Sequence, residues 1–279
     1  MVPLKGEPQR VISVNGSATE LLLRLGLEKK IVGTAYLDNP VAQDLQAAYE
    51  SAPVIAERYP TRERVLALEP DFIYGWGSAF KPQALGDVKY WHNLGIATFI
   101  SRNSVLKPQR IDNFFLDIAN LGKIFNIDDK VENYILSAKS EFEKIQKIVK
   151  GAKIKKKLII GEYLPNKLFL AYGSTSLVSE MLAIAGGENL LPNGAILSAE
   201  GLVDLNPPVI VMIHMLKTEG DVASHLDEIR KDPILSKLDS VKSAHVYPMP
   251  LAEAHCAGVR ISSGVARLAQ YLYPDLFSE

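Results

Sequence analysis

Cysteine, long apolar runs and an excess of charge of one sign are scarce or missing in this chain of 279 residues. The single cysteine, Cys256, excludes an internal disulfide and leaves the redox compartment undefined. No apolar segment approaches the roughly 18 residues of a membrane span, and residues 1–10 lack the apolar core of a signal peptide. The formal net charge of −1 argues against a nucleic-acid partner, which would require a basic face.

Motifs of catalysis and of nucleotide binding are also missing. The five histidines form no closely spaced metal-binding pair, and residues 173–176 lack the nucleophile-elbow pattern. No glycine-rich phosphate loop follows a predicted strand. The neighbours His255 and Cys256 could bind a soft metal, but adjacent residues rarely form a site. We therefore expect neither an enzyme nor a resident cofactor.

What the chain does have is an alternation of short apolar segments with amphipathic ones, which indicates parallel α/β construction. Ser17 and Glu20 fit a capping box that opens a helix after the first apolar segment. Residues 129–150 carry apolar side chains at helical spacing without Gly or Pro, and predict one helix of roughly 33 Å. The segments that predict strands are residues 11–14, 31–33, 72–74, 97–100, 158–160, 209–213 and 246–247.

The chain also carries a weak internal repeat. Residues 63–70 begin with Glu and end with Pro, and residues 200–207 do the same, with apolar residues matching between them. Each copy runs directly into a predicted strand. Earlier in each half, an apolar helix opened by Thr-Glu or Ser-Glu reaches a glycine, Gly26 or Gly186, at the same offset from its Glu. Self-similarity on this scale suggests two similarly built lobes.

We therefore expect an N-terminal α/β lobe over residues 1–125, a connecting helix over residues 126–152 and a C-terminal α/β lobe over residues 153–279. A ligand cleft between the lobes follows from this division. The alternative is a single domain in which the long helix is a core element.

Two side chains stand at nearly equivalent ends of the repeated strands. Trp76 follows the first and His214 the second, and ligands of α/β sheets bind beyond the carboxyl ends of strands. Ordinary packing for Trp76 and a hydrogen-bonded histidine for His214 are the alternatives. Arg58, Arg102 and Arg260 lie on nearby loops, and guanidinium groups bind carboxylates and phosphates. Each arginine alone could be a surface charge, but together they favour an anionic ligand.

Glu63 and Glu200 begin the two copies of the repeat, each at the start of a predicted helix. A carboxylate there complements the helix dipole by about 0.3–1 kcal/mol. The functional interpretation, compatible with the structural one, is that each lobe presents one exposed acid to a partner.

Taken together, the sequence resembles the substrate-binding proteins of ABC importers for ferric siderophores, haem and vitamin B12, over nearly the whole chain from Arg10. The resemblance implies two Rossmann-like lobes with parallel sheets, joined by a single long helix, in a monomer without a membrane span. It also implies a periplasmic protein, or a lipoprotein anchored to the outer face of the cytoplasmic membrane, whose signal sequence is outside this chain. It rests on residues 10–13, 18–21, 64–73, 186–189 and 271–274.

By the same resemblance, Glu63 and Glu200 dock onto the ABC permease dimer, and the ligand is a metal chelate. Arg58 stands close to where haem-binding relatives carry a Met, which favours a ferric siderophore over haem. Trp76 resembles an aromatic residue of the vitamin B12 binder, so cobalamin stays open, as does an oxyanion such as molybdate. From another class, a cytosolic metal-chelatase-like enzyme could use the same architecture. The residues expected to contact the ligand are Tyr36, Arg58, Tyr59, Trp76, Arg102, Tyr172, His214 (also a candidate metal ligand), His255 and Arg260.

Overall fold

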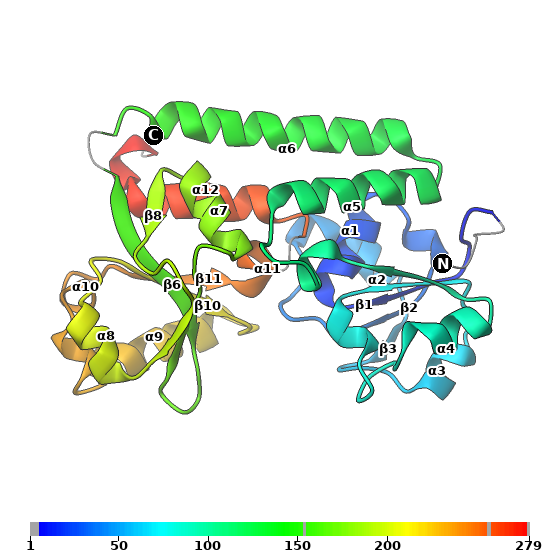
Figure 1. The fold of residues 1–279 in the computed structure, drawn as a ribbon, viewed down its shortest axis with the longest axis horizontal. Coiled ribbons are helices and arrows are strands. Elements are labelled where there is room, and N and C mark those ends of the chain that lie inside the picture. Colours follow the sequence, from blue (N-terminus) through cyan, green and yellow to red (C-terminus); the bar gives the residue numbers. More distant parts are fainter. Residues whose placement is uncertain (1–5, 153–154, 256–257, 278–279) are drawn as a thin grey trace. The chain divides into compact units, whose positions relative to one another are not determined.

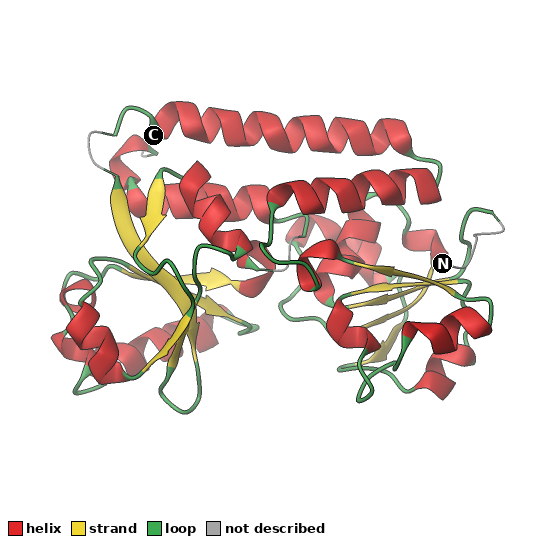
Figure 2. Ribbon diagram, in the orientation of Figure 1, coloured by secondary structure: helices red, strands yellow, loops and turns green. Residues whose placement is uncertain are grey.

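The computed structural model describes residues 6–152, 155–255 and 258–277, and the chain forms two compact units. Unit 1 comprises Met1–Ser137 and Cys256–Val259, and unit 2 comprises Ala138–His255 and Arg260–Glu279. Each unit contains one β-sheet with its own helices (Figures 1 and 2). The expected two α/β lobes are therefore confirmed.

The sheet of unit 1 is wholly parallel. Its five strands lie in the order β3-β2-β1-β4-β5, and Val14 of β1 pairs with Ala35 of β2 and with Gly75 of β4. The carboxyl ends of these three strands therefore meet at one edge. The strands are β1 (Val11–Val14), β2 (Ile31–Ala35), β3 (Val54–Ala56), β4 (Phe72–Gly75) and β5 (Ala97–Ile100).

Helices follow the strands of unit 1, as parallel pairing requires. Every residue of β1 is buried, and Trp91 of α4 is fully buried, with its indole N–H donating to the Leu85 carbonyl at 3.1 Å. The helices are α1 (Gly16–Arg24), α2 (Gln46–Glu50), α3 (Arg62–Leu66), α4 (Val88–Asn93) and α5 (Ile111–Ile124).

The sheet of unit 2 is mixed, which corrects the expectation of parallel sheets in both lobes. Its order is β11-β10-β6-β7-β9, and β8 pairs with β6. β7 runs antiparallel to β6 and β9 because β6 turns directly into β7, with the Leu164 N–H donating to the Leu168 carbonyl at 2.8 Å. So short a connection makes a hairpin and cannot make a parallel crossover. The strands are β6 (Lys156–Tyr163), β7 (Phe169–Ala171), β8 (Gly187–Asn189), β9 (Ala195–Leu197), β10 (Ile210–His214) and β11 (Val246–Pro250).

The expected long helix is confirmed as α6, the 22 residues Asp128–Val149, and the boundary between the units falls inside it. The remaining helices belong to unit 2. They are α7 (Leu177–Ile184), α8 (Ala199–Leu205), α9 (Glu219–Lys231), α10 (Asp239–Lys242), α11 (Leu251–Ala254) and α12 (Ile261–Leu272).

The start of α1 differs from the expected capping box. The helix begins at Gly16 with Asn15 as N-cap residue, so Ser17 and Glu20 already lie inside it. Their side chains serve tertiary contacts instead: Ser17 Oγ accepts from the Trp76 indole at 2.8 Å, and Glu20 Oε1 accepts from the Ala42 N–H at 2.8 Å. The prediction of this helix is confirmed, but the capping role predicted for Ser17 and Glu20 is wrong.

Candidate ligand and docking sites

The carboxyl edge of the sheet in unit 1 is formed by residues in an unusual backbone conformation. Asn15 and Tyr36 directly follow β1 and β2, and both have positive φ, 85° and 60°. They are neighbours, since the Asn15 N–H donates to the Ala35 carbonyl at 3.0 Å. Non-glycine residues in such conformations cost of order 1–3 kcal/mol and cluster at functional sites. This edge is therefore the candidate ligand surface of unit 1.

Trp76 lies at the same edge, and hydrogen bonds fix both its backbone and its indole ring. Its backbone N–H donates to Asn15 Oδ1 at 3.2 Å, and its indole N–H donates to Ser17 Oγ at 2.8 Å. The next residue, Gly77, donates its N–H to Ser104 Oγ at 2.8 Å. The ring is half-buried, so one aromatic surface is presented in a fixed orientation.

Tyr36, Arg58 and Tyr59, all expected to contact ligand, are brought together by the structure. The two tyrosine rings stack with centroids 4.7 Å apart and an interplanar angle of 17°. Arg58 lies over the Tyr36 ring, 5.1 Å from its centroid, and donates to the Tyr36 hydroxyl at 2.9 Å. We call these three side chains the tyrosine–arginine cluster.

Asp38, which the sequence reasoning missed, lies beside this cluster and beside the N-terminus of α1. Burial raises the pKa of its carboxyl to about 6, against the lowering effects of the hydrogen bonds from the Gly16 N–H and its own N–H and of the nearby charge of Arg58. Asp38 could have been proposed from the sequence, because it is an acid in the loop directly after a predicted strand. Its isolation from any recognisable motif is why it was overlooked.

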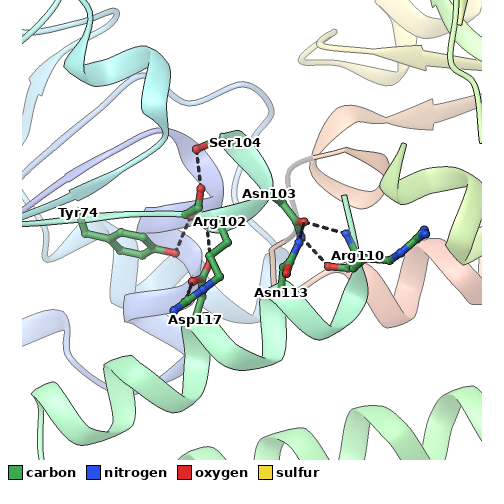
Figure 3. Close-up of polar contacts among 8 residues, drawn as sticks. Tyr74, Arg102, Asn103, Ser104, Arg110, Asn113 and Asp117 are labelled. Atoms are coloured by element: carbon green, nitrogen blue, oxygen red, sulfur yellow. Dashed lines mark hydrogen bonds and ion pairs between the residues drawn. The ribbon is translucent and has the colours of Figure 1, made fainter. Parts of the chain in front are cut away.

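Arg102 is directed onto α5 and forms an ion pair with Asp117 (Figure 3). The Asp117 carboxylate also accepts from the Arg102 backbone N–H at 2.8 Å, and its side chain is only 4% exposed. Burial raises the pKa of Asp117 to about 6 despite these contacts. Close by, the buried Tyr74 hydroxyl and Ser101 Oγ are 3.1 Å apart. The Arg102 guanidinium thus already has a partner within unit 1.

Asn103 fixes the loop after β5 from its other side (Figure 3). Its amide donates to the Arg110 carbonyl at 2.8 Å, and its carbonyl accepts from the Arg110 N–H at 2.9 Å and from the Asn113 amide at 3.0 Å. The neighbouring Ser104 is the hydroxyl that holds Gly77. This network therefore orients the turn that carries Trp76.

Unit 2 contains a cavity of about 820 Å³ beyond the carboxyl ends of β6 and β10, a size that suits a small-molecule ligand. His214 is the expected residue that reaches it, and the remaining walls were not foreseen. They come from the β6–β7 hairpin, the segment after β10, and α9. The lining residues are Glu162, Tyr163, Leu164, Pro165, Lys167, Ile213, His214, Met215, Leu216, His225, Glu228, Lys231, Asp232 and Pro233.

The surroundings of His214 favour the neutral form of its imidazole. Burial lowers the pKa of its imidazole, and the nearby His225 lowers it further. Its Nδ1 accepts from the Leu216 N–H at 3.3 Å. Within the described part of the chain, no group of three or more His, Cys, Asp or Glu side chains is arranged to hold a metal ion.

The remaining expected contacts of unit 2 are Tyr172, His255 and Arg260. The Tyr172 ring stacks on His255 with centroids 5.0 Å apart and an angle of 8°, and its hydroxyl donates to the Glu162 carboxylate. Tyr172 leaves the sheet beside Ile160 of β6. Arg260 is half-buried at the start of α12.

Glu63 and Glu200 have the same local structure. Each is fully exposed in the first turn of its helix, α3 or α8, and the hydroxyl of Thr61 or Ser198 caps that helix. The pKa of both carboxyls is lowered, first by the residue's own backbone N–H and then by the capping hydroxyl. Each unit thus presents one ionised carboxylate in a fixed orientation.

Comparison with known proteins gives a family match over most of the chain. The family described as "Periplasmic binding protein" matches residues 11–252. An uncharacterized ABC transporter substrate-binding lipoprotein, YvrC of Bacillus subtilis (strain 168), is 25% identical over 282 residues, covering 100% of this chain and 84% of that protein. A vitamin B12-binding protein of Yersinia pestis (strain Pestoides F) is 28% identical over 211 residues, covering 73% of this chain and 69% of that protein.

Among solved structures, a periplasmic binding protein from Veillonella parvula superposes with a TM-score of 0.87 at 23% identity, covering 97% of this chain and 93% of that one. At this identity the likeness establishes the fold alone. None of the described helices is both long enough and apolar enough to cross a membrane.

Proposed function

This chain belongs to the periplasmic binding protein family, and we propose that it captures a metal chelate outside the cytoplasm and delivers it to an ABC permease. The lipoprotein relative supports an extracytoplasmic place, in the periplasm or on the outer face of the cytoplasmic membrane. In this role the protein binds and hands over its ligand without chemical change, so no catalytic residue and no resident cofactor are required.

The observation that carries the proposal is the duplicated glutamate. Glu63 and Glu200 lie on exposed surface in equivalent positions, one in each unit. A carboxylate in the first turn of an exposed helix contributes only about 0.3–1 kcal/mol, so neither acid is needed to stabilise the fold. Across an interface, complementary charge mainly sets the encounter rate and the register. Two such acids suit a permease built from two related subunits.

For the ligand, we propose a ferric siderophore as the first candidate. In unit 1 the tyrosine–arginine cluster and Trp76 supply aromatic surface. In unit 2 the proposed contacts are Tyr172, His214, His255 and Arg260, and His214 is the candidate for a direct bond to the metal. A neutral imidazole is the form that binds metal ions.

Cobalamin is the second candidate. Two observations favour it: the half-buried Trp76 indole at the sheet edge and the 28% identity to a vitamin B12-binding protein. A flat macrocycle would pack against aromatic rings, which bury large apolar areas at little entropic cost.

Equilibrium titration of the purified protein tests the proposal, with a ferric siderophore, haemin, cyanocobalamin and molybdate as probes. The chain has two tryptophans, and Trp91 is fully buried, so a bound chelate should quench mainly Trp76. Because these chelates absorb light themselves, a Trp76→Phe variant and free tryptophan serve as controls. Saturable quenching by a chelate supports the function. Binding of molybdate alone, or of no probe, contradicts it.

A further inference from the structure

Four of the cationic side chains at the candidate ligand surfaces, Arg58, Arg102, Lys167 and Lys231, stand beside acids of the same unit. Arg102 pairs with Asp117, and Arg58 binds the Tyr36 hydroxyl within the field of Asp38. In the cavity of unit 2, Lys167 pairs with Asp232 at 3.2 Å and Lys231 with Asp227 at 3.6 Å. These surfaces therefore carry much less positive charge than their arginines and lysines suggest.

At the edge of unit 1, Asp38 lies beside the two groups that would attract an anion, the N-terminus of α1 and Arg58. The N-terminus of a helix carries about half a positive charge and attracts anions. At α1 this position is already taken, because the Asp38 carboxyl accepts from the Gly16 N–H. A β-carbon on Gly16 would lie 3.7 Å from Asp38 Oδ2. The same carboxylate also offsets the positive charge of Arg58. An incoming anion would therefore meet a negative group beside both groups that would attract it, the N-terminus of α1 and the Arg58 guanidinium.

What this edge and the cavity offer instead is apolar and aromatic surface. Tyr36 and Tyr59 stack at the edge, Trp76 is held beside Asn15, and Met215 and Leu216 line the cavity. Such surface binds a chelate whose metal charge is balanced by its own ligand atoms. Three hydroxamates neutralise Fe³⁺, and cyanocobalamin is also neutral, whereas three catecholates leave a triply negative complex.

Resting on the proposed function, we propose that this chain selects metal chelates without net negative charge, and that Asp38 is the residue that sets this selectivity. Asp38 acts through the electrostatic field at the sheet edge and through Arg58. Against a triply negative chelate centred about 10 Å away, one ionised carboxylate is worth about tenfold in affinity when the effective dielectric constant is close to that of water, about 80. The inference replaces the anionic ligand expected from the arginines alone.

The experiment compares the dissociation constants of a ferric trishydroxamate and a ferric tricatecholate for the wild type and for Asp38→Asn. Asparagine keeps the shape and can still accept from the Gly16 N–H. The matched control is Asp129→Asn, which removes an exposed acid in the first turn of α6. Its neighbour Lys130 lies against Gly26, beyond the C-terminal end of α1, whereas Asp38 lies at the N-terminal end of that helix. Circular dichroism and thermal unfolding establish that each variant is folded.

The wild type should bind the trishydroxamate more tightly, and Asp38→Asn should shift the ratio of the two dissociation constants about tenfold toward the tricatecholate. Asp129→Asn should shift it less than twofold. Arg58→Gln provides a second, independent variant and should shift the ratio in the opposite direction. A wild type that prefers the tricatecholate, or equal ratios in Asp38→Asn and Asp129→Asn, overturns the inference while the chelate function stands. Failure of the wild type to bind any chelate overturns the proposed function and the inference with it.

Discussion

Glu63 and Glu200 each stand two residues after the hydroxyl that caps their helix and six residues before a residue in the left-handed conformation. The capping hydroxyls accept from the Arg64 N–H at 3.3 Å and the Gly201 N–H at 3.2 Å. The left-handed residues are Glu69 and Asn206, with φ of 46° and 39°. A proline follows each and leads to the strand next to one edge of its sheet, β4 or β10. The repeat in the sequence is therefore a repeat in structure, with the two acids at equivalent positions.

The Arg102–Asp117 pair should be measurable as a coupling in stability. Arg102→Ala keeps the backbone N–H that donates to Asp117 but removes the charged partner of this buried carboxylate. Because the Arg102 side chain is 35% exposed, water offsets part of the loss. We expect Arg102→Ala to lower the free energy of unfolding by about 1–3 kcal/mol. In a double-mutant cycle with Asp117→Ala, urea unfolding should give a coupling of about 1–2 kcal/mol. Simple additivity would contradict the pair.

Asp38 should make stability depend on pH in a direction opposite to that of an ordinary paired carboxylate. Its pKa is raised from 3.8 to about 6 in the folded chain, chiefly by burial, so the folded state retains a proton that the unfolded state releases. The stabilisation is present below about pH 4 and is lost as the pH rises through about 6.

Asp38→Asn does not titrate at this position. Relative to the wild type, it should therefore become more stable by on the order of 2–3 kcal/mol between about pH 4 and pH 7. Urea unfolding of both proteins at a series of pH values measures the difference. A difference that stays constant with pH would show that the carboxyl is not buried as described.

Two glycines of unit 2 should respond in opposite ways to alanine. A β-carbon on Gly264 of α12 would lie 2.2 Å from the Glu253 carbonyl oxygen, a backbone atom that cannot move aside freely. Gly264→Ala should lower the free energy of unfolding by about 1–3 kcal/mol. On Gly201 of α8, the nearest atoms would be 3.8 Å away, so Gly201→Ala should be neutral or stabilise by up to about 1 kcal/mol. Equal effects would contradict the packing at α12.

Much of this fold could be predicted because its signals are local. Apolar runs such as residues 72–74 and the unbroken helical pattern that became α6 depend only on neighbouring residues. The short strands β3, β7, β8 and β9 were missed, since three residues carry almost no periodicity. The antiparallel turn into β7 decided the mixed sheet. Pro165 and Asn166 mark a turn at this point of the sequence, but a turn alone does not say that the chain returns as an antiparallel strand.

The candidate site was predictable only in part, for the same reason. Position after a predicted strand pointed to Tyr36 and Trp76, because strand ends can be read locally, whereas Arg58 and Tyr59 were proposed from their place before a turn. The partners of each charge could not be read this way. Asp117 lies fifteen residues from Arg102 and meets it only through the packing of α5, and Asp38 reaches Gly16 only because β1 and β2 are adjacent.

The central claim is delivery of the chelate to a permease. The most direct measurement is the ATPase activity of the cognate permease in the presence of chelate, compared between the wild type and the double variant Glu63→Ala/Glu200→Ala. The control is Glu69→Asn/Asp204→Ala, which removes two other exposed acids from the same two segments and places at the left-handed Glu69 the residue found at position 206. The double variant at Glu63 and Glu200 should keep its fold and its affinity for the chelate, while stimulation falls to near the basal rate, with each single variant between. The control should stimulate normally. Full stimulation by Glu63→Ala/Glu200→Ala, or loss of chelate binding in its place, would contradict the account.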